Sequence, residues 1–453
     1  MVDFPYLPQT DEDRRNMLEK IGVQTIDELI DNAIPRDIQF DGKLPISDGL
    51  SDIEVERILS SLASENRAAK MKNFIGGGAY NMYVPAPVDE IVSRPEFYTA
   101  YTPYQPEVSQ GTLTAIFEFQ TMMTALTAMD VSNASMYDGA SATAEAAILA
   151  MHSTKRKRVI YSQGLNPLYV EVLRTYIHGF DVELVPLPLS GGSVDISALE
   201  KLVDENTACV IIQNPNFFGV VEDGGAFADI IHSKGAVYIV SIPDPMSLGI
   251  ITPPGDYGAD VAVGEAQQFG NYVSYGGPYI GFFTAKKEFL RSMPGRIIGM
   301  TQDVDGRRGF VMVFQTREQH IRRARATSNI CTNQQLCALR ATVYLALLGA
   351  RGFSAISKLL FDRAHYLAER LAEIDGISLL FDAPFFREFA VKIPGEASEV
   401  VETLARKNII PGLNLGRFYP SMKDVLLLAS SDLYGKDDID ELVDSLKRYW
   451  NEI

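Results

Sequence analysis

The sequence has no lysine between Lys234 and Lys286, although this stretch has the pattern of three consecutive buried strands. Runs of branched and aromatic residues predict these strands at 235–241, 259–264 and 279–284. The loop after the second strand offers glutamines, whose amide nitrogens are neither basic nor nucleophilic. Covalent chemistry through a lysine is therefore excluded from this stretch.

Cysteine, histidine and long apolar runs are also scarce. The three cysteines (Cys209, Cys331 and Cys337) form no CxxC pair, which predicts free thiols in a reducing compartment. The five histidines lack metal-ligand spacing such as HExxH, so we expect no metal site. No apolar run reaches the roughly 18 residues of a membrane span, and the first residues lack the features of a signal peptide. We expect a cytoplasmic protein.

Positive charge is in deficit. Asp and Glu outnumber Lys and Arg by 58 to 41, which gives a formal net charge of -17. We therefore expect no general binding to nucleic acid or to an anionic membrane, because both need basic surfaces. The length of 453 residues suits two or three segments around a large core.

The pattern along the chain predicts three parts. Residues 1–65 are predicted to form a helical, acidic arm, which either wraps a neighbouring subunit or is a loosely packed extension. Strands and helices alternate over residues 66–315, which predicts an α/β domain with a mostly parallel sheet. Residues 316–453 are predicted to form linking helices, helical from about 315 to 372, and then a small α+β domain.

A glycine and small hydroxyl residues stand at the start of an alanine-rich helix, in the segment 137–143. Such a start presents free backbone N–H groups and the positive end of the helix dipole, which suits a phosphate. The candidate phosphate-binding residues are Gly139, Ala140, Ser141 and Thr143. The alternative is a plain helix N-cap without a ligand.

Two further polar segments are candidates for a site. The segment 99–111 sets aromatics, amides and one carboxylate among prolines, which suits a rigid lining for a polar ligand, an interface, or only an ordered loop. Asn214 follows a strand, at the edge where ligands bind in open α/β sheets, although a simple turn would look the same.

The three-strand pattern is typical of enzymes that use pyridoxal phosphate (PLP). In aminotransferase-like enzymes the first strand ends in an Asp that holds the pyridine nitrogen, and the loop after the second carries the Schiff-base lysine. Here Asp244 follows the first strand, and Gln267 and Gln268 stand in the loop. The chain is therefore either not a PLP protein, or a PLP-type subunit that cannot hold the cofactor covalently on its own.

Several motifs together closely resemble the P-protein of the glycine cleavage system, specifically subunit 1 (alpha) of its two-subunit form. The motifs span nearly the whole chain and are FIGGGAY (74–80), YTPYQPEVSQG (101–111), YDGASA (137–142), QNPNF (213–217), GEAQQFG (264–270), YGGP (275–278) and TSNICTN (327–333). Asn166 is a departure, because subunit 1 sequences often show a His at this position.

The resemblance implies a fold type I PLP-dependent transferase, with a small α+β C-terminal domain. It implies a PLP-dependent decarboxylase that acts on glycine and passes an aminomethyl unit to the lipoyl arm of the H-protein. It places the lysine and the covalent PLP on subunit 2 (beta), in a heterotetramer with two copies of each subunit. Gln268 falls where the lysine of beta would fall, which leaves Gly139–Thr143, Asn214, Asp244 and Gln268 as a degenerate cofactor pocket.

Because the active site of this fold lies between subunits, the resemblance makes four residues candidates for reaching into the active site of beta. They are Tyr101, Tyr104, Gln105 and Glu107.

Two alternatives stay open. The first is a stand-alone PLP enzyme that uses Lys286 or Lys287, although both follow the third strand at an expected solvated helix start. The second is a non-catalytic scaffold or regulatory protein that kept the fold. The dense polar segment at 99–111 favours a retained role in chemistry.

Overall fold

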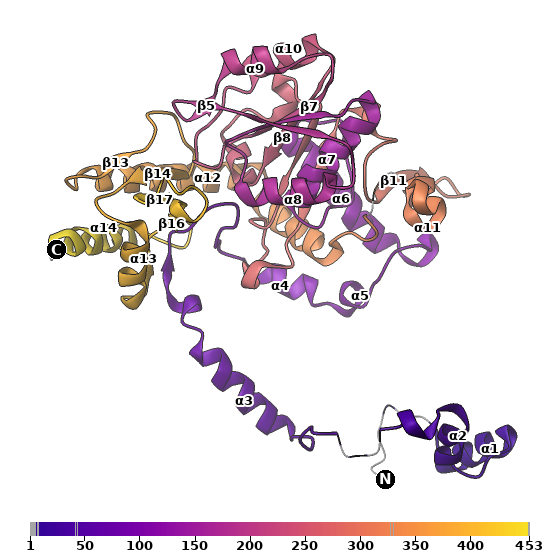
Figure 1. Cartoon of the computed structure of the whole chain (residues 1–453). Coiled ribbons are helices and arrows are strands. Elements are labelled where there is room, and N and C mark those ends of the chain that lie inside the picture. The colour runs from indigo at the N-terminus through magenta and orange to yellow at the C-terminus, as the bar shows by residue number, and fades with distance from the viewer. Residues whose placement is uncertain are drawn as a thin grey trace. The chain divides into compact units, whose positions relative to one another are not determined.

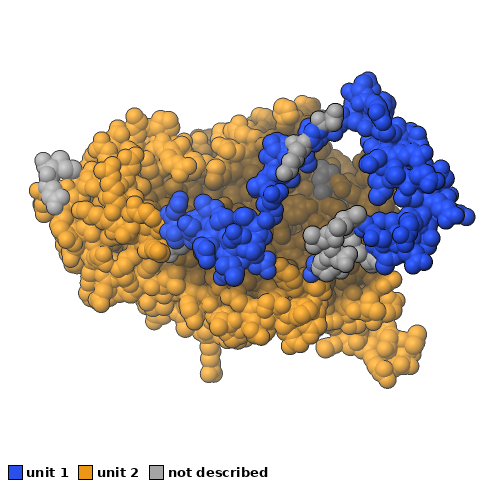
Figure 2. Space-filling model, turned by 90° about the horizontal axis from the view of Figure 1, so that it is seen from below, with its two compact units in different colours: residues 1–66 blue, residues 67–453 orange. Residues whose placement is uncertain are grey.

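The computed structural model describes residues 6, 9–40, 42, 44–326, 328 and 330–451, and the side chain of residue 69 is not described. The chain divides into two compact units, Met1–Asn66 and Arg67–Ile453, which Figure 2 colours separately. The predicted boundary at residue 315, between a large and a small domain, stays a prediction.

The first unit is an arm of three α-helices in its described part. They are α1 (Asp11–Ile21), α2 (Ile26–Ala33) and α3 (Asp52–Glu65), with a 3-10 turn η1 (Arg36–Ile38) before the proline-rich connection. Thr10 and Ser51 each close a capping box with an acidic residue three positions later, which fixes where α1 and α3 begin.

The second unit is built on a sheet that has seven strands in the described part of the chain. In spatial order they are β2 (Val131–Ser132), β10 (Gly281–Ala285), β9 (Val261–Glu265), β8 (Val237–Ile242), β7 (Thr207–Gln213), β3 (Arg158–Ser162) and β4 (Glu183–Leu187). The five strands from β9 to β4 are parallel, whereas β10 is antiparallel to β9 and β2. The predicted mostly parallel sheet is therefore present.

Helices lie on both faces of this sheet (Figure 1), and apolar clusters fill the space between them and the strands. Neighbouring residues of one strand belong to different layers, as Ile239 and Val240 of β8 show, because side chains alternate across a sheet. One layer contains α7 (Gly139–Thr154) and α8 (Pro167–Ile177). The opposite layer contains α6 (Gln110–Thr127), α9 (Ile196–Leu202), α10 (Gly225–Ser233) and α12 (Gln335–Ala372).

The C-terminal part is a second, antiparallel sheet, with four strands among the described residues. Its order is β13 (Ser378–Leu379), β14 (Glu388–Lys392), β17 (Val425–Ala429) and β16 (Leu413–Asn414). The helices α13 (Ala397–Arg406) and α14 (Lys436–Asn451) share an apolar cluster with the end of α12 and this sheet. This is the predicted α+β arrangement.

Shorter elements connect these layers. The strands are β1 (Lys72–Asn73) with β15 (Ile409–Ile410), β5 (Leu189–Ser190) with β6 (Ser193–Val194), and β11 (Ile297–Gln302) with β12 (Arg308–Val313). The α-helices are α4 (Ala86–Val92), α5 (Pro95–Tyr98) and α11 (Gln319–Arg322). The 3-10 turns are η2 (Ala68–Lys70), η3 (Pro106–Val108), η4 (Pro245–Gly249), η5 (Pro254–Tyr257), η6 (Ser274–Gly276), η7 (Lys287–Phe289), η8 (Gln315–Arg317), η9 (Arg323–Arg325) and η10 (Leu415–Arg417).

The expected helical stretch from 315 to 372 differs from the structure in its first third. Its described residues form only the short elements η8, α11 and η9, and the long helix α12 begins at Gln335. A buried arginine, Arg317, donates hydrogen bonds to the carbonyl oxygens of Met293 and Gly295, and this tertiary anchoring competes with a continuous helix. The motif at 327–333 lies partly outside the described residues, at positions 327 and 329.

One described helix, α12, is long and apolar enough to cross a membrane by length and composition alone, with a mean hydropathy of 1.3 over its most apolar window. Half of that window is buried inside the protein, where its residues belong to the apolar cluster shared with α6 and the central sheet. A buried core helix passes the same test, and the packing of α12 is that of a core helix.

Gly219 gives a test of the junction between the two sheets. Its φ is +90°, and a Cβ there would lie 1.9 Å from the carbonyl oxygen of Glu388. We expect Gly219→Ala to lower the free energy of unfolding by about 3 kcal/mol or more, because left-handed strain adds to a backbone clash. Gly306→Ala is the control, since its φ is +79° with nothing within 4 Å, and it should cost only about 1 kcal/mol. Equal losses in urea unfolding would contradict this account.

Candidate functional site

The buried candidate residues meet at one edge of the central sheet. Asn214 follows β7, Asp244 follows β8, and Gln268 follows β9. These three strands are parallel, so their carboxyl ends lie side by side at the edge where α/β proteins bind ligands. Gly139 begins α7 at the same edge, because its N–H reaches the Glu265 side chain at the end of β9.

The N-terminus of α7 is satisfied by the protein itself. Asp138 is the N-cap and accepts the N–H of Ser141 at 2.7 Å, while the Ser141 hydroxyl donates back to the Asp138 carbonyl oxygen at 3.0 Å. The Thr143 hydroxyl donates to the Gly139 carbonyl oxygen at 2.8 Å and lies 3.1 Å from the Ser241 hydroxyl. Both hydroxyls therefore have partners within the protein, as in the plain N-cap alternative.

The Glu265 side chain binds the first N–H of α7, which is one of the donors that an anion at this helix start would use. Its carboxyl oxygens accept the backbone N–H groups of Gly139 at 3.0 Å, Ile280 at 3.1 Å and Gln267 at 3.2 Å. Burial raises the pKa of Glu265 to about 8 in spite of these three donors. A Cβ at Gly139 would also lie 2.4 Å from the hydroxyl oxygen of Tyr169, so the helix start is closely packed on β9 and α8.

A buried ion pair closes the space beside Asp244. Arg387, which is fully buried, holds Asp244 with two bonds: Nε to Oδ2 at 2.5 Å and Nη2 to Oδ1 at 2.8 Å. Its guanidinium lies over the Tyr80 ring, 3.8 Å from the centroid. Arg387 directly precedes β14, so the pair joins the central sheet to the C-terminal sheet, and both Asp244 oxygens accept a hydrogen bond from it.

The glycine run before Tyr80 completes this closed cluster. Gly77 donates its N–H to Oε1 of Glu388 at 2.5 Å, and the Tyr80 hydroxyl donates to Oε2 at 3.0 Å. A Cβ on Gly76 would lie 1.7 Å from the same Oε1, which explains why a residue without a side chain is needed there. Burial raises the pKa of Glu388 to about 7.

The amides at the sheet edge are also engaged. Gln268 is fully buried and donates its Nε2 to the carbonyl oxygen of Pro243 at 2.8 Å, while its Oε1 has no hydrogen-bond partner among the described residues. Asn214 donates to and accepts from the backbone of Glu222, at 3.2 and 3.0 Å. Asn166 caps α8 and donates to the Gly77 carbonyl oxygen at 2.8 Å.

These contacts do not fit PLP on this chain. The position of the imine-forming lysine is an amide, the carboxylate for the pyridine nitrogen is neutralised by Arg387, and the first N–H of α7 is bound to Glu265. The assignment of a phosphate to Gly139, Ala140, Ser141 and Thr143 stays a prediction, and the hydrogen bonds count against it. Sequence reasoning missed Tyr80, Glu265 and Glu388, although Glu265 ends a buried strand and could have been noticed for that reason.

The lysines of the stand-alone alternative lie at the other edge of the sheet. Because β10 is antiparallel to β9, its end at Ala285 pairs with the start of β9 at Val261. Lys286 follows directly, and its Nζ lies 2.6 Å from Oδ1 of Asp260. Lys286 and Lys287 are therefore a full strand length away from Gln268, which removes support from that alternative.

The segment 99–111 runs along the surface through η3 and into the first two residues of α6. Tyr101 is 77% exposed and Tyr104 52% exposed, and Gln105 and Glu107 are exposed as well. Gln110 anchors the loop through two hydrogen bonds with the backbone of Phe310, at 2.8 and 2.9 Å. Of the four candidates, Tyr104 makes an edge-on contact with His320, 6.1 Å between ring centroids. The structure therefore separates an exposed polar loop from the buried residues at the sheet edge.

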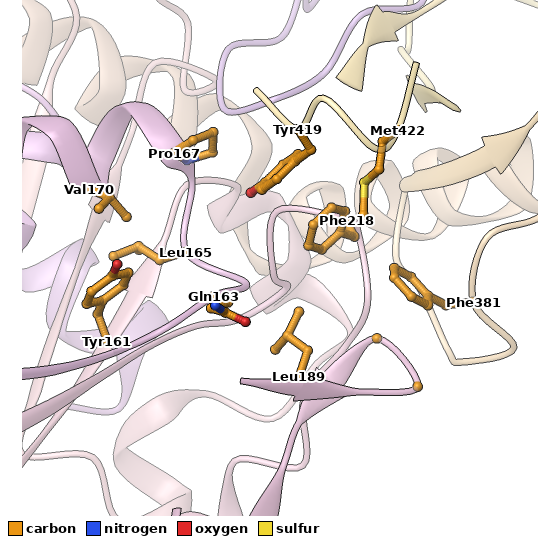
Figure 3. A pocket seen from close by; sticks show the side chains of 12 residues that line it. Tyr161, Gln163, Leu165, Pro167, Val170, Leu189, Phe218, Phe381, Tyr419 and Met422 are labelled. Atoms are coloured by element: carbon orange, nitrogen blue, oxygen red, sulfur yellow. The ribbon is translucent and has the colours of Figure 1, made fainter. Parts of the chain in front are cut away.

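A separate pocket of about 480 Å³ lies beside the end of β3 (Figure 3). Its described lining is mostly apolar and aromatic, with Leu189, Phe218, Phe381, Tyr419 and Met422 around the Gln163 amide. This lining contains no carboxylate, lysine or histidine, so the pocket offers no group for acid–base chemistry at neutral pH.

The fold is that of PLP-dependent fold type I enzymes. A glutamate decarboxylase from Lactobacillus brevis superimposes with a TM-score of 0.70 at 12% identity, over 93% of this chain and 97% of that chain. The crystal structure of a glycine decarboxylase (P-protein) of the glycine cleavage system, in inhibitor-bound form, gives a TM-score of 0.91 at 42% identity, over 98% of this chain and 99% of that one.

Sequence comparison is more specific than the fold. The profile of the family "Glycine cleavage system P-protein" matches residues 5–446. A relative from Chloroherpeton thalassium, named "Probable glycine dehydrogenase (decarboxylating) subunit 1", is 47% identical over 445 residues, which cover 98% of this chain and 99% of the relative. The chain belongs to the glycine cleavage system P-protein family. The predicted family and fold class are thereby confirmed.

The ion pair predicts a strongly non-additive mutant cycle. Arg387→Met and Asp244→Asn should each lower the free energy of unfolding by about 3–5 kcal/mol, because each leaves a buried group without its partner. The free energy of unfolding of the double variant should fall by far less than the sum of the two single losses, since the double variant buries no lone charge. Urea unfolding of the four proteins measures this, and additive losses would show that the pair does not act as a unit.

Glu265 predicts a pH dependence of stability. Its folded pKa is about 8, above the ordinary 4.5, so the folded state holds a proton that the unfolded state releases between these values. Its contribution to stability is therefore complete below pH 4.5 and is lost as the pH rises through about 8, at up to about 1.4 kcal/mol per pH unit. Glu265→Gln should flatten this decline in unfolding measured from pH 5 to pH 8. The exposed Glu288→Gln is the control and should keep the slope of the unmodified protein.

Proposed function

We propose that this chain is subunit 1 of a two-subunit glycine dehydrogenase (decarboxylating), and that it acts only together with a lysine-bearing subunit 2. That partner carries PLP covalently, and the two subunits assemble as two copies of each. The complex decarboxylates glycine and transfers the remaining aminomethyl group to the lipoyl arm of the H-protein. The naming of full-length relatives as subunit 1 supports a partner subunit.

The observation that carries the proposal is the closed sheet edge. Gln268 cannot form an imine, and Asp244 is bound to Arg387, so this chain cannot anchor PLP by itself. When bound on the partner, PLP supplies an electron sink for the decarboxylation of an amino acid. We therefore infer that this chain contributes to the chemistry from outside its own pocket.

The exposed loop at 99–111 is the part of this chain that suits such a contribution. Tyr101, Tyr104 and Gln105 present hydroxyl and amide groups that can orient a small zwitterion, and Glu107 presents a carboxylate that can bind an ammonium group. The prolines in the loop and the anchor at Gln110 hold the backbone in place, so these groups are preorganised.

The proposal places the complex in the cytoplasm. In the structure Cys331 is exposed and free, while Cys209 and Cys337 are buried and free, which suits a reducing compartment. The net charge of -17 supports small-molecule and protein partners in place of nucleic acid or an anionic membrane.

The decisive experiment uses the chain alone and the chain co-expressed with a candidate subunit 2. The absorbance spectrum with added PLP should show a borohydride-trappable band only in the complex, and the labelled lysine should map to subunit 2. Glycine-dependent exchange of CO2 should likewise require both chains. A trappable band and full decarboxylation by this chain alone would contradict the proposal and favour the stand-alone alternative.

Glu107→Gln tests the role of the loop. We expect the variant complex to assemble normally and to lose about 100-fold in glycine-dependent CO2 exchange, because a positioned carboxylate near the substrate is replaced by a neutral amide. Glu96→Gln in α5 is the matched control, since this exposed carboxylate pairs only with Arg94 at the surface. Equal activities of the two variants would remove Glu107 from the site.

A further inference from the structure

Helix α3 carries an exposed apolar stripe. Val55, Ile58, Leu59 and Leu62 follow the spacing of one helix face, and they are 41%, 48%, 59% and 59% exposed. The structure describes all residues of α3, and none of them is buried. A stripe of this kind is typical of a helix that packs against another surface.

The rest of the described arm repeats this feature. Helices α1 and α2 bury none of their residues either. Other large apolar side chains of the arm are also exposed, namely Met17, Ile21, Ile26, Ile30, Ile34, Ile38, Phe40, Leu44, Ile46 and Leu50. Such a density of exposed apolar side chains is unusual for a free surface and marks an interaction site. Helices of 8 to 14 residues are also marginal without packing partners.

The net charge of the arm indicates which kind of surface binds its exposed apolar side chains. Residues 1–66 contain 15 acidic and 6 basic residues, so about a seventh of the chain carries more than half of its net charge of -17. The remaining residues are net negative as well, which disfavours both the second unit of this chain and another copy of it as the covering surface. An apolar groove with a basic rim is the complementary surface.

We propose that the arm docks α3, through Val55, Ile58, Leu59 and Leu62, into an apolar groove with a basic rim on the lysine-bearing partner subunit. This inference rests on the proposed two-subunit enzyme. A permanent partner fits better than a carrier protein that comes and goes, because obligate interfaces are the more apolar ones and a transient partner would leave the stripe bare between encounters.

The same helix supplies a matched control. Ile53 is 66% exposed but points to the side of α3 opposite the stripe, about 180° around the axis from Leu62 at 100° per residue. Leu59→Glu and Ile53→Glu introduce the same charge on the same helix, so only the face differs. Neither side chain is buried in this chain, so both variants should fold, which circular dichroism and the urea midpoint check.

The experiment measures assembly of the full-length chain with subunit 2 by sedimentation. We expect Leu59→Glu to weaken the complex at least tenfold, the triple change at Ile58, Leu59 and Leu62 to weaken it at least 100-fold, and Ile53→Glu to change it less than threefold. Hydrogen exchange of residues 52–65 should slow in the complex and be fast in the isolated chain at every concentration.

Several outcomes would overturn the docking proposal. They are an unchanged affinity of Leu59→Glu, equal effects of the two faces, and protection of α3 in the isolated chain, by its own second unit or by another copy. Glycine-dependent CO2 exchange by the unmodified pair separates this from the proposed function. If the unmodified pair exchanges CO2 and Leu59→Glu assembles with unchanged affinity, only the docking proposal is rejected. If assembly depends on α3 but the pair does not exchange CO2, only the enzymatic proposal is rejected.

Discussion

The bidentate contact between Asp244 and Arg387 is the interaction on which the arrangement of this chain depends. It links the carboxyl edge of the parallel sheet to the C-terminal sheet, and neither residue is more than 5% exposed. A buried guanidinium needs compensation for its lost hydration, which Asp244 and the face of Tyr80 provide. With this pair formed, the end of β8 is covered by protein groups, whereas the pocket beside the end of β3 is open.

The other contacts at this edge agree with such a closed state. Glu265 takes the first N–H of α7, Glu388 takes the glycine backbone and the Tyr80 hydroxyl, and Gln268 binds the carbonyl oxygen of Pro243. Asp244, the first N–H of α7 and the Gln268 Nε2 are thus each hydrogen-bonded to another group of the protein. The proposed function accordingly rests on the surface, on the polar loop at 99–111 and the apolar arm, both of which suit a second subunit.

Much of the fold followed from local patterns. The strands β8 and β9 were predicted within two residues of their bounds, because a buried parallel strand is a continuous apolar run. The region from 315 to 334 was predicted wrongly as helical, since the partners of Arg317 lie more than 20 residues away in the sequence. About half of the candidate site could be predicted from the sequence. Asp244 and Gln268 followed from strand ends, whereas no local pattern in the sequence indicated Glu388.

The sequence by itself determined that this chain has no lysine where its fold would use one, that a helix begins near Gly139, and that the arm is acidic and helical. These features depend on residue type and short spacing. Only the tertiary structure decided that Asp244 meets Arg387, 143 residues further along the chain, and that Tyr101 and Tyr104 face solvent. A buried polar group must find a partner, and folding, not sequence spacing, determines which residue is near enough to serve.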